Sequence, residues 1–212
     1  MPGIRTLRPL YRIFSLIIIA CLCQSCAKST LNSSWTDTSY HGPVKGTILV
    51  IGVIRDPIAH KIYENSFVTE LEKAGIQALP SYNYDLRTPK PSIEKLRQVV
   101  KQTGASAILI THLLNEKSST YQFPDEGYVY AGSMSWSEIS GYHSAVYAVV
   151  WGGDKSISRT VDRMEAVLFD GKSGKRIWSA RSKSVNLKEL LLKDDEQLAE
   201  LFIKDLKAHN LL

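Results

Sequence analysis

The stretch TILVIGVI at residues 47–54 decides the fold of this chain. It is almost wholly aliphatic, which is typical of a strand buried on both faces of a sheet. A helix signal follows directly, because Asp56 suits the N-cap, Pro57 suits the first helical position and Gly75 suits the helix end. This succession of a buried strand and a capped helix predicts the start of an α/β domain.

The same alternation continues as far as residue 114. Residues 76–79 predict a short second strand, Ser92 and Gly104 delimit a second helix, and residues 105–114 (ASAILITHLL) predict a third strand. Strands that alternate with helices in this order pair in parallel through right-handed crossovers. We therefore expect a parallel βαβαβ unit in the first half of the chain.

The second half has a different pattern. Residues 121–151 are rich in aromatic side chains and predict strands, and residues 161–182 predict a hairpin that turns at DGKSG (170–174) and has both faces covered. Asp194, with Gln197 three residues later, resembles a capping box that opens a C-terminal helix. The expected fold is α/β, with a mixed sheet, a parallel βαβαβ first half, antiparallel hairpins in the second half and a C-terminal helix.

The N-terminal residues 1–20 are expected to be a signal peptide. Three arginines precede an apolar run at residues 13–20 (IFSLIIIA), which is far shorter than the roughly 20 residues of a membrane-spanning helix. These arginines also account for most of the formal net charge of +5, so the remaining chain is nearly neutral. A nearly neutral domain has no general electrostatic reason to bind nucleic acid.

All three cysteines follow the apolar run directly, at Cys21, Cys23 and Cys26. The sequence Ile18-Ile19-Ala20-Cys21 resembles the lipobox of bacterial lipoproteins, in which the cysteine carries diacylglycerol. Cys21 is our first choice for lipidation, and Cys26 is the alternative because cleavage there gives a longer apolar run. Neither cysteine is followed by aspartate, which in lipoproteins implies sorting to the outer membrane. A secretory signal cut elsewhere, with incidental cysteines, is the remaining alternative.

Residues 21–46 are expected to form a lipidated flexible tether, because the part from residue 27 onward is rich in Ser, Thr, Asn and Gly and lacks an apolar period. Residues 47–212 would then be a single periplasmic domain. At 44% apolar and 22% charged residues, the composition is that of a globular protein.

Several of these features together resemble a known group of proteins. They are the lipobox, the strand at 47–54 that leads through Arg55-Asp56 into a helix bearing Glu64, and the hairpin from Leu168-Phe-Asp-Gly to Ile177-Trp178-Ser179. The chain resembles poorly characterised outer-membrane lipoproteins, whose domain is similar to the N-terminal domain of TolB and to the periplasmic domain of the curli-export lipoprotein. The resemblance covers about residues 45–212. It implies a role in envelope assembly, secretion or scaffolding, and it implies no catalytic residues.

Candidate ligand-binding residues follow the carboxyl ends of the predicted parallel strands. Ligands in open α/β sheets bind at that edge, where this chain has Arg55, Asp56, His60 and His112. With Ser81 nearby, these residues allow an envelope hydrolase or a small-ligand binder as the alternative function. Structural roles are favoured, since no G-x-S-x-G motif is present and Asp56 is explained as a helix cap.

No metal or cofactor is expected. The five histidines lack H-x-x-x-H spacing, and Gly52 is isolated within the first strand, where a nucleotide-binding loop needs several glycines.

The aromatic segment is the stronger functional signal. Tyr128, Tyr130 and Trp136 are candidate partner-contact residues, because rigid rings among Gly and Ser bury much area when proteins associate. The competing interpretation is that these rings face the core. We expect a non-catalytic outer-membrane lipoprotein that reaches the membrane through its lipid anchor and binds envelope proteins or itself.

Overall fold

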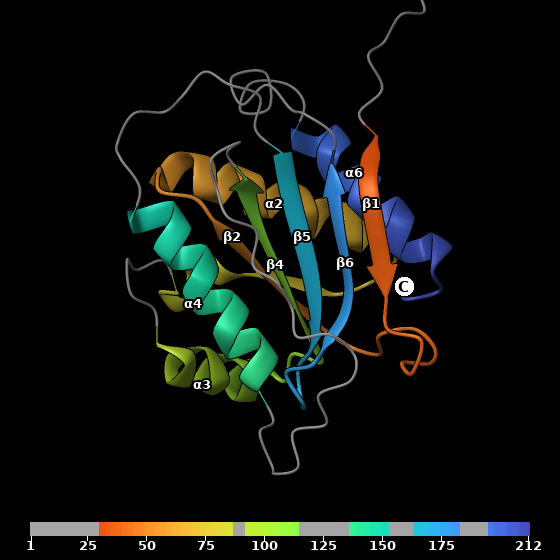
Figure 1. Cartoon of the computed structure of the whole chain (residues 1–212), viewed down its shortest axis with the longest axis horizontal. Helices are drawn as coiled ribbons and strands as arrows, with labels where there is room; N and C mark the ends of the chain where they lie inside the picture. The colour runs from red at the N-terminus through yellow and green to blue at the C-terminus, as the bar shows by residue number, and fades with distance from the viewer. Residues whose placement is uncertain (1–29, 87–91, 115–135, 153–162, 183–194) are drawn as a thin grey trace, which may run out of the picture.

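The computed structural model describes residues 30–86, 92–114, 136–152, 163–182 and 195–212. Within these residues one six-stranded mixed sheet has the strand order β1-β6-β5-β4-β2-β3, and helices lie on both of its faces (Figure 1). The predicted α/β fold is confirmed.

The first half is built as the sequence predicts. Strand β2 (Ile48–Val53) pairs in parallel with β3 (Ala78–Pro80) and β4 (Ala107–Leu114), and all six residues of β2 are buried. Helix α2 (Pro57–Lys73) follows β2, and α3 (Ile93–Thr103) precedes β4, with a short 3-10 helix η1 (Ser81–Tyr84) after β3.

The helix caps explain where these helices begin and end. The Asp56 carboxylate accepts hydrogen bonds from the backbone N–H groups of Ile58 and Ala59 at 2.9 and 2.7 Å. Ser92 caps α3 in the same way, and Gly104 ends it with φ 66°, a conformation that favours glycine.

Two antiparallel strands form the predicted hairpin. They are β5 (Arg163–Asp170) and β6 (Arg176–Ser182), and β5 also pairs antiparallel with β4. In the turn, Asp170 Oδ1 accepts from the backbone N–H and the hydroxyl of Ser173, each at 2.6 Å. Helix α6 (Asp195–Ala208) follows at the C-terminus, and the residues that it buries include Leu198, Phe202 and Leu206.

One prediction for the second half is wrong. Where strands were expected, residues 137–152 form helix α4 (Ser137–Gly152). Ile139, Tyr142 and Val146 recur at helical spacing and are buried against β2, β4 and β5. Aromatic residues are compatible with either secondary structure, and here burial of this stripe selects the helix.

The N-terminal boundary also differs from the prediction. Residues 31–36, which were assigned to the tether, form strand β1 (Leu31–Thr36), which pairs antiparallel with β6. Ser34 lies opposite Ala180, and Trp35 lies opposite Ser179. Its polar sequence, LNSSWT, suits a strand that has one neighbour only and is partly exposed. The folded domain therefore begins before residue 47.

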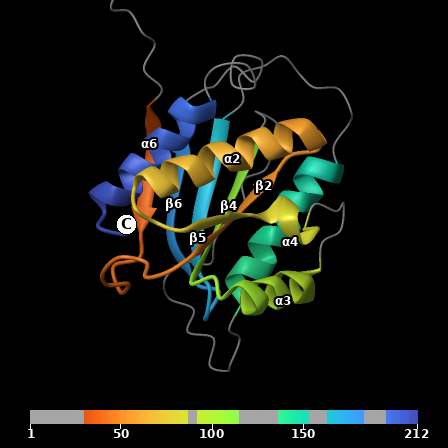
Figure 2. The same cartoon turned by 180° about the vertical axis from the view of Figure 1, so that it is seen from behind.

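Two hydrophobic cores lie on the two faces of the sheet. Helices α2 and α6 cover one face across its width, and their core includes Tyr63, Phe67, Trp178 and Phe202 (Figure 2). Helices α3 and α4 cover only the β2 side of the other face (Figure 1), where Tyr142 and Phe169 pack. In the part of the chain that is described, no helix covers β6 and β1 on that second face.

The apolar residues of α2 are not all buried. Phe67 and Leu71 have no exposed surface, whereas the exposed fractions of Ile58 and Ile62 are 70% and 43%. The first turns of α2 bury His60, Tyr63 and Glu64 instead.

Candidate functional site

The residues predicted to form a ligand crevice are not brought together. His60 extends from α2, and His112 packs against Tyr142 of α4, so the sheet separates the two histidines. Asp56 is occupied as the cap of α2, and the Arg55 side chain donates to the carbonyl oxygen of Val150.

Glu64 forms the centre of a closed polar cluster on the α2 face. Its carboxylate has no exposed surface. It accepts hydrogen bonds from the backbone N–H groups of Gly52 and Tyr82 at 2.7 and 3.1 Å, and from the Ser81 hydroxyl at 2.5 Å. His60 Nε2 lies 2.9 Å from the same Oε1 atom that Ser81 contacts. These groups tie the start of α2 to β2 and η1.

Gly52 is required at the bottom of this cluster. A Cβ atom there would lie 2.8 Å from the Tyr63 ring and 3.2 Å from the Glu64 side chain. The isolated glycine of the first strand therefore serves close packing of α2 and has no part in a phosphate-binding loop.

The cluster does not have the geometry of a serine hydrolase. In such a site the histidine accepts the proton of the serine hydroxyl. Here Ser81 donates to Glu64, and His60 contacts the same carboxylate oxygen. The second ring nitrogen of His60, Nδ1, is buried and has no hydrogen-bond partner.

A second buried carboxylate, Glu165, lies on the opposite face of the sheet. Its Oε2 atom accepts from the Tyr142 hydroxyl at 2.9 Å, and its Oε1 atom accepts from Arg181 Nε at 2.6 Å. The Tyr142 hydroxyl also lies 3.2 Å from His112 Nδ1. Glu165 and Arg181 stand opposite each other on β5 and β6, so strand register creates this pair.

Burial sets the protonation states around Glu165. Desolvation lowers the pKa of His112 to about 4, although the nearby Glu165 charge opposes this shift. Desolvation also raises the pKa of the Tyr142 hydroxyl, and the Glu165 charge raises it further. His112 is therefore neutral and Tyr142 protonated near pH 7, which leaves the Tyr142 hydroxyl as a donor to Glu165.

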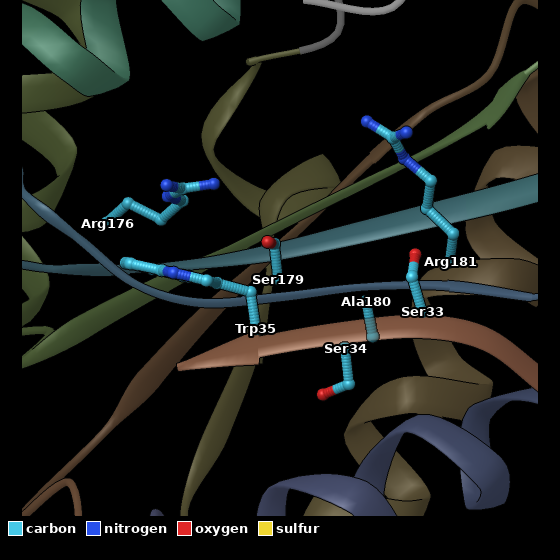
Figure 3. Close-up of a pocket in the computed structure, with 7 residues that line it drawn as sticks. All are labelled: Ser33, Ser34, Trp35, Arg176, Ser179, Ala180 and Arg181. Carbon is cyan, nitrogen blue, oxygen red and sulfur yellow. The ribbon is translucent and has the colours of Figure 1, made fainter. Parts of the chain in front are cut away.

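Arg181 connects this buried cluster to a hollow on the surface. The hollow has a volume of about 220 Å³ and lies over β1 and β6, where no described helix covers the sheet (Figure 3). It is lined by Ser33, Ser34, Trp35, Arg176, Ser179, Ala180 and Arg181.

An aromatic ring and a cation stack at one end of the hollow. The Arg176 guanidinium carbon lies 3.6 Å from the centre of the Trp35 ring, which is a cation–π contact. In Figure 3, Arg176, Ser179 and Arg181 lie on one side of the ribbon, while Ser34 and Ala180 point to the other side. Tryptophan and arginine are the residues most enriched at the energetic centres of protein interfaces.

The predicted partner-contact residues are not part of this hollow. Tyr128 and Tyr130 lie outside the described residues. Trp136 is only 7% exposed, which agrees with the competing interpretation that its ring faces the core. It packs against the hairpin turn, where its indole N–H donates to the Lys172 carbonyl oxygen at 3.1 Å and a Cβ on Gly174 would clash with it.

The lipidation candidates Cys21 and Cys26 also lie outside the described residues. Within the described ranges, no helix is both long and apolar enough to cross a membrane. The same ranges hold no group of three His, Cys, Asp or Glu residues arranged to bind a metal ion.

Neither strand β1 nor the site residues of the hollow were predicted from the sequence, although strand β6 was. Trp35 was assigned to the tether, and Arg181 had no feature that separated it from other surface arginines. Trp35 could have indicated a folded segment, because it is an isolated tryptophan within a polar stretch and a large ring is seldom left without contacts.

Comparisons with known proteins give structural neighbours only. No protein-family model matches the chain, and no curated protein sequence matches it. Among solved structures, a PelC dodecamer from Paraburkholderia phytofirmans is 13% identical, with a TM-score of 0.42 over 87% of this chain and 99% of that chain. A single-substitution variant of that PelC gives a TM-score of 0.44 with the same identity and coverage.

Lipoprotein GNA1162 from Neisseria meningitidis is 14% identical, with a TM-score of 0.35 over 77% of this chain and 96% of that chain. At these values the similarity assigns no function or partner to this chain.

Proposed function

We propose that this chain is a lipid-anchored protein of the bacterial outer membrane whose periplasmic domain binds a protein partner and catalyses no reaction. The observation that carries the proposal is the hollow over β1 and β6, where Trp35, Arg176 and Arg181 line a part of the sheet that no described helix covers. A partly exposed tryptophan ring beside two arginines is characteristic of protein-binding surfaces.

The anchor is supported by the sequence alone. The basic residues, the short apolar run and Cys21 follow one another as in a lipoprotein signal, with Cys26 as the second candidate. Two or more acyl chains provide stable membrane attachment, whereas one chain binds only marginally.

A non-catalytic role is supported by the contacts of the crevice residues. Asp56, His60, Ser81 and His112 all make contacts within the fold that account for their burial or position. Ser81, the serine of the proposed crevice, donates to Glu64 and not to a histidine, so this geometry does not favour the alternative of an envelope hydrolase.

The partner-binding role is tested by site-specific photocrosslinking in intact cells. A photoreactive amino acid at Ser33, which is exposed beside Trp35, should crosslink to a partner, and Trp35→Ala should abolish that product. The control position is Lys204, which is exposed on α6 on the other face of the sheet. A product that contains two copies of this chain would identify self-association. If Trp35→Ala leaves every Ser33 product unchanged, the hollow is not the binding surface.

The anchor is tested by metabolic labelling with a radioactive fatty acid. Cys21→Ala, Cys26→Ala or the double variant should abolish labelling and block processing or release the domain from membranes. Unchanged labelling and attachment in the double variant would refute the lipoprotein assignment.

A further inference from the structure

We infer that the hollow over β1 and β6 binds an extended acidic peptide segment of the partner, which adds as a strand to the outer edge of β1 and places carboxylates against Arg181 and Arg176. The inference rests on the proposed partner-binding function and names the chemistry of the partner.

Five of the seven lining residues present their side chains as a regular grid on one face of the sheet. Ser33 stands opposite Arg181, and Trp35 stands opposite Ser179, across the antiparallel pair β1 and β6. Arg176 completes the grid by lying over the Trp35 ring. Because side chains alternate along a strand, a third strand beside β1 would present every second side chain to this same grid.

Arg181 is held ready to bind an anion. Its Nε atom donates to the buried Glu165 at 2.6 Å, and Glu165 is in turn fixed by the Tyr142 hydroxyl. A guanidinium has five N–H donors, and no further hydrogen bond joins Arg181 to the described residues. Its side chain is 34% exposed, so the remaining donors are accessible from the hollow. A carboxylate can accept two of them side by side.

The small residues of the grid leave room for such a ligand. The hydroxyls of Ser33 and Ser179 make no hydrogen bond to any described residue, and each can donate one proton to an anion. Among the described residues, two carboxylates contact Arg181 or Arg176 but do not line the hollow. Glu165 is buried behind Arg181, and Glu138 accepts the backbone N–H of Arg176 at 2.8 Å.

The free edge of β1 favours a peptide over other anionic ligands. In the described part of the chain β1 is the last strand of the sheet, so alternate N–H and C=O groups along it point away from β6. A peptide strand satisfies these groups by β-augmentation, in which backbone hydrogen bonds give affinity and alternate side chains give specificity. A polysaccharide or a free anion would contact the arginines but would leave the outward N–H and C=O groups of β1 without a partner strand.

The test is direct binding of synthetic peptides to the purified full-length lipoprotein in detergent micelles. The probe is a fluorescent nine-residue peptide of alternating Thr or Val and Glu, and the matched control peptide has Gln at every Glu position. We expect saturable binding of the Glu peptide that weakens as salt is raised, and binding of the Gln peptide at least about tenfold weaker.

Three protein variants locate the site. Arg176→Gln should weaken binding of the Glu peptide about tenfold, because one charge-assisted contact is lost. Arg181→Gln combined with Glu165→Gln removes the second cation without leaving a buried charge unpaired, and it should have an effect of similar size. Lys204→Gln removes one charge from the other face and should leave binding unchanged.

Several outcomes would overturn the inference. They are absence of binding, equal binding of the Glu and Gln peptides, an affinity that no hollow variant alters, or tighter binding of an acidic oligosaccharide than of the Glu peptide. If these results occur while Trp35→Ala still abolishes the crosslinks from Ser33, partner binding at the hollow stands and only the acidic peptide is wrong.

Discussion

Each face of the sheet holds a glutamate that is almost fully buried, Glu64 on one face and Glu165 on the other, and the surroundings of these two glutamates differ. Glu64, beneath α2, receives every one of its contacts from buried or backbone groups and has no exposed surface. Glu165, on the other face, contacts the buried Tyr142 on one side and the partly exposed Arg181 on the other. A polar cluster closed on all sides can only hold elements together, whereas one with an exposed member can also act on the surface.

The largest effect is expected from the fully covered face. Trp178 has no exposed surface, packs against Phe202, and donates its indole N–H to Asp205 at 2.9 Å. Trp178→Ala should lower the free energy of unfolding by about 3 to 5 kcal/mol, since a large cavity remains and Asp205 loses one of its hydrogen bonds. Urea unfolding followed by circular dichroism measures this loss, and a change below about 1 kcal/mol would show that the α6 side is not a tightly packed core.

A smaller loss is expected from the closed cluster. Glu64→Gln removes the charge that four groups contact and places an amide N–H₂ where a backbone N–H now donates, so we expect a loss of about 2 kcal/mol. The same unfolding assay applies. The matched control is Glu72→Gln on the exposed side of α2, which should change stability by no more than about 0.5 kcal/mol. Equal effects of Glu64→Gln and Glu72→Gln would mean that the buried contacts of Glu64 add no stability beyond that of an exposed glutamate.

The clusters around Glu64 and Glu165 show which parts of the structure could be predicted from the sequence. Burial of β2, the caps at Asp56 and Ser92 and the hairpin turn were predictable, because each depends on residues adjacent in sequence. Glu64 and Glu165 acquire their roles from groups on other elements, so their contacts depend on packing and on strand register. The hollow could not be predicted either, because a polar edge strand such as β1 has the composition of a linker.

Helix α4 shows a different reason for error. Its residues carry aromatic and β-branched side chains that are common in strands, and Gly141 weakens the helical signal. Only the packing of Ile139, Tyr142 and Val146 against the sheet distinguishes the helix from a strand.

The free energy of unfolding should also depend on pH, through His112 in the buried cluster around Glu165. The pKa of His112 is about 4 in the folded protein, below its ordinary value of 6.5, because burial disfavours the charged ring. Between about pH 4 and pH 6.5, the unfolded chain therefore binds a proton at His112 that the folded chain does not bind. The stability that this histidine contributes is complete above about pH 6.5 and is lost as pH falls toward 4, at up to about 1.4 kcal/mol per pH unit.

Urea midpoints measured between pH 7 and pH 4.5 check this dependence. His143 has a lowered pKa of about 4 for the same reason and adds to the slope. His112→Asn should flatten the pH dependence without removing it. An identical slope in that variant would mean that His112 does not titrate differently in the folded and unfolded states.

The smallest effect on folding is expected at the open part of the second face. Trp35→Ala removes a ring that is partly exposed and contacts Arg176, so thermal and urea unfolding should show a loss of about 1 kcal/mol or less. A loss as large as that of Trp178→Ala would mean that β1 is essential to the core, and the effect of Trp35→Ala on crosslinking would then reflect unfolding.

If the chain is lipidated as proposed, strand β1 also limits how far the domain can move from the membrane. With a lipid on Cys21, only residues 22–30 would connect the lipid to β1, and that segment can span at most about 35 Å when fully extended. With a lipid on Cys26, the connecting residues would be 27–30, and the maximum distance would be roughly half as long. Because β1 runs antiparallel to β4, its first residue lies at the edge of the sheet where β2 and β4 end and α2 begins. A tethered domain would therefore work within about one bilayer thickness of the lipid surface, and any partner strand would have to approach β1 inside that narrow layer.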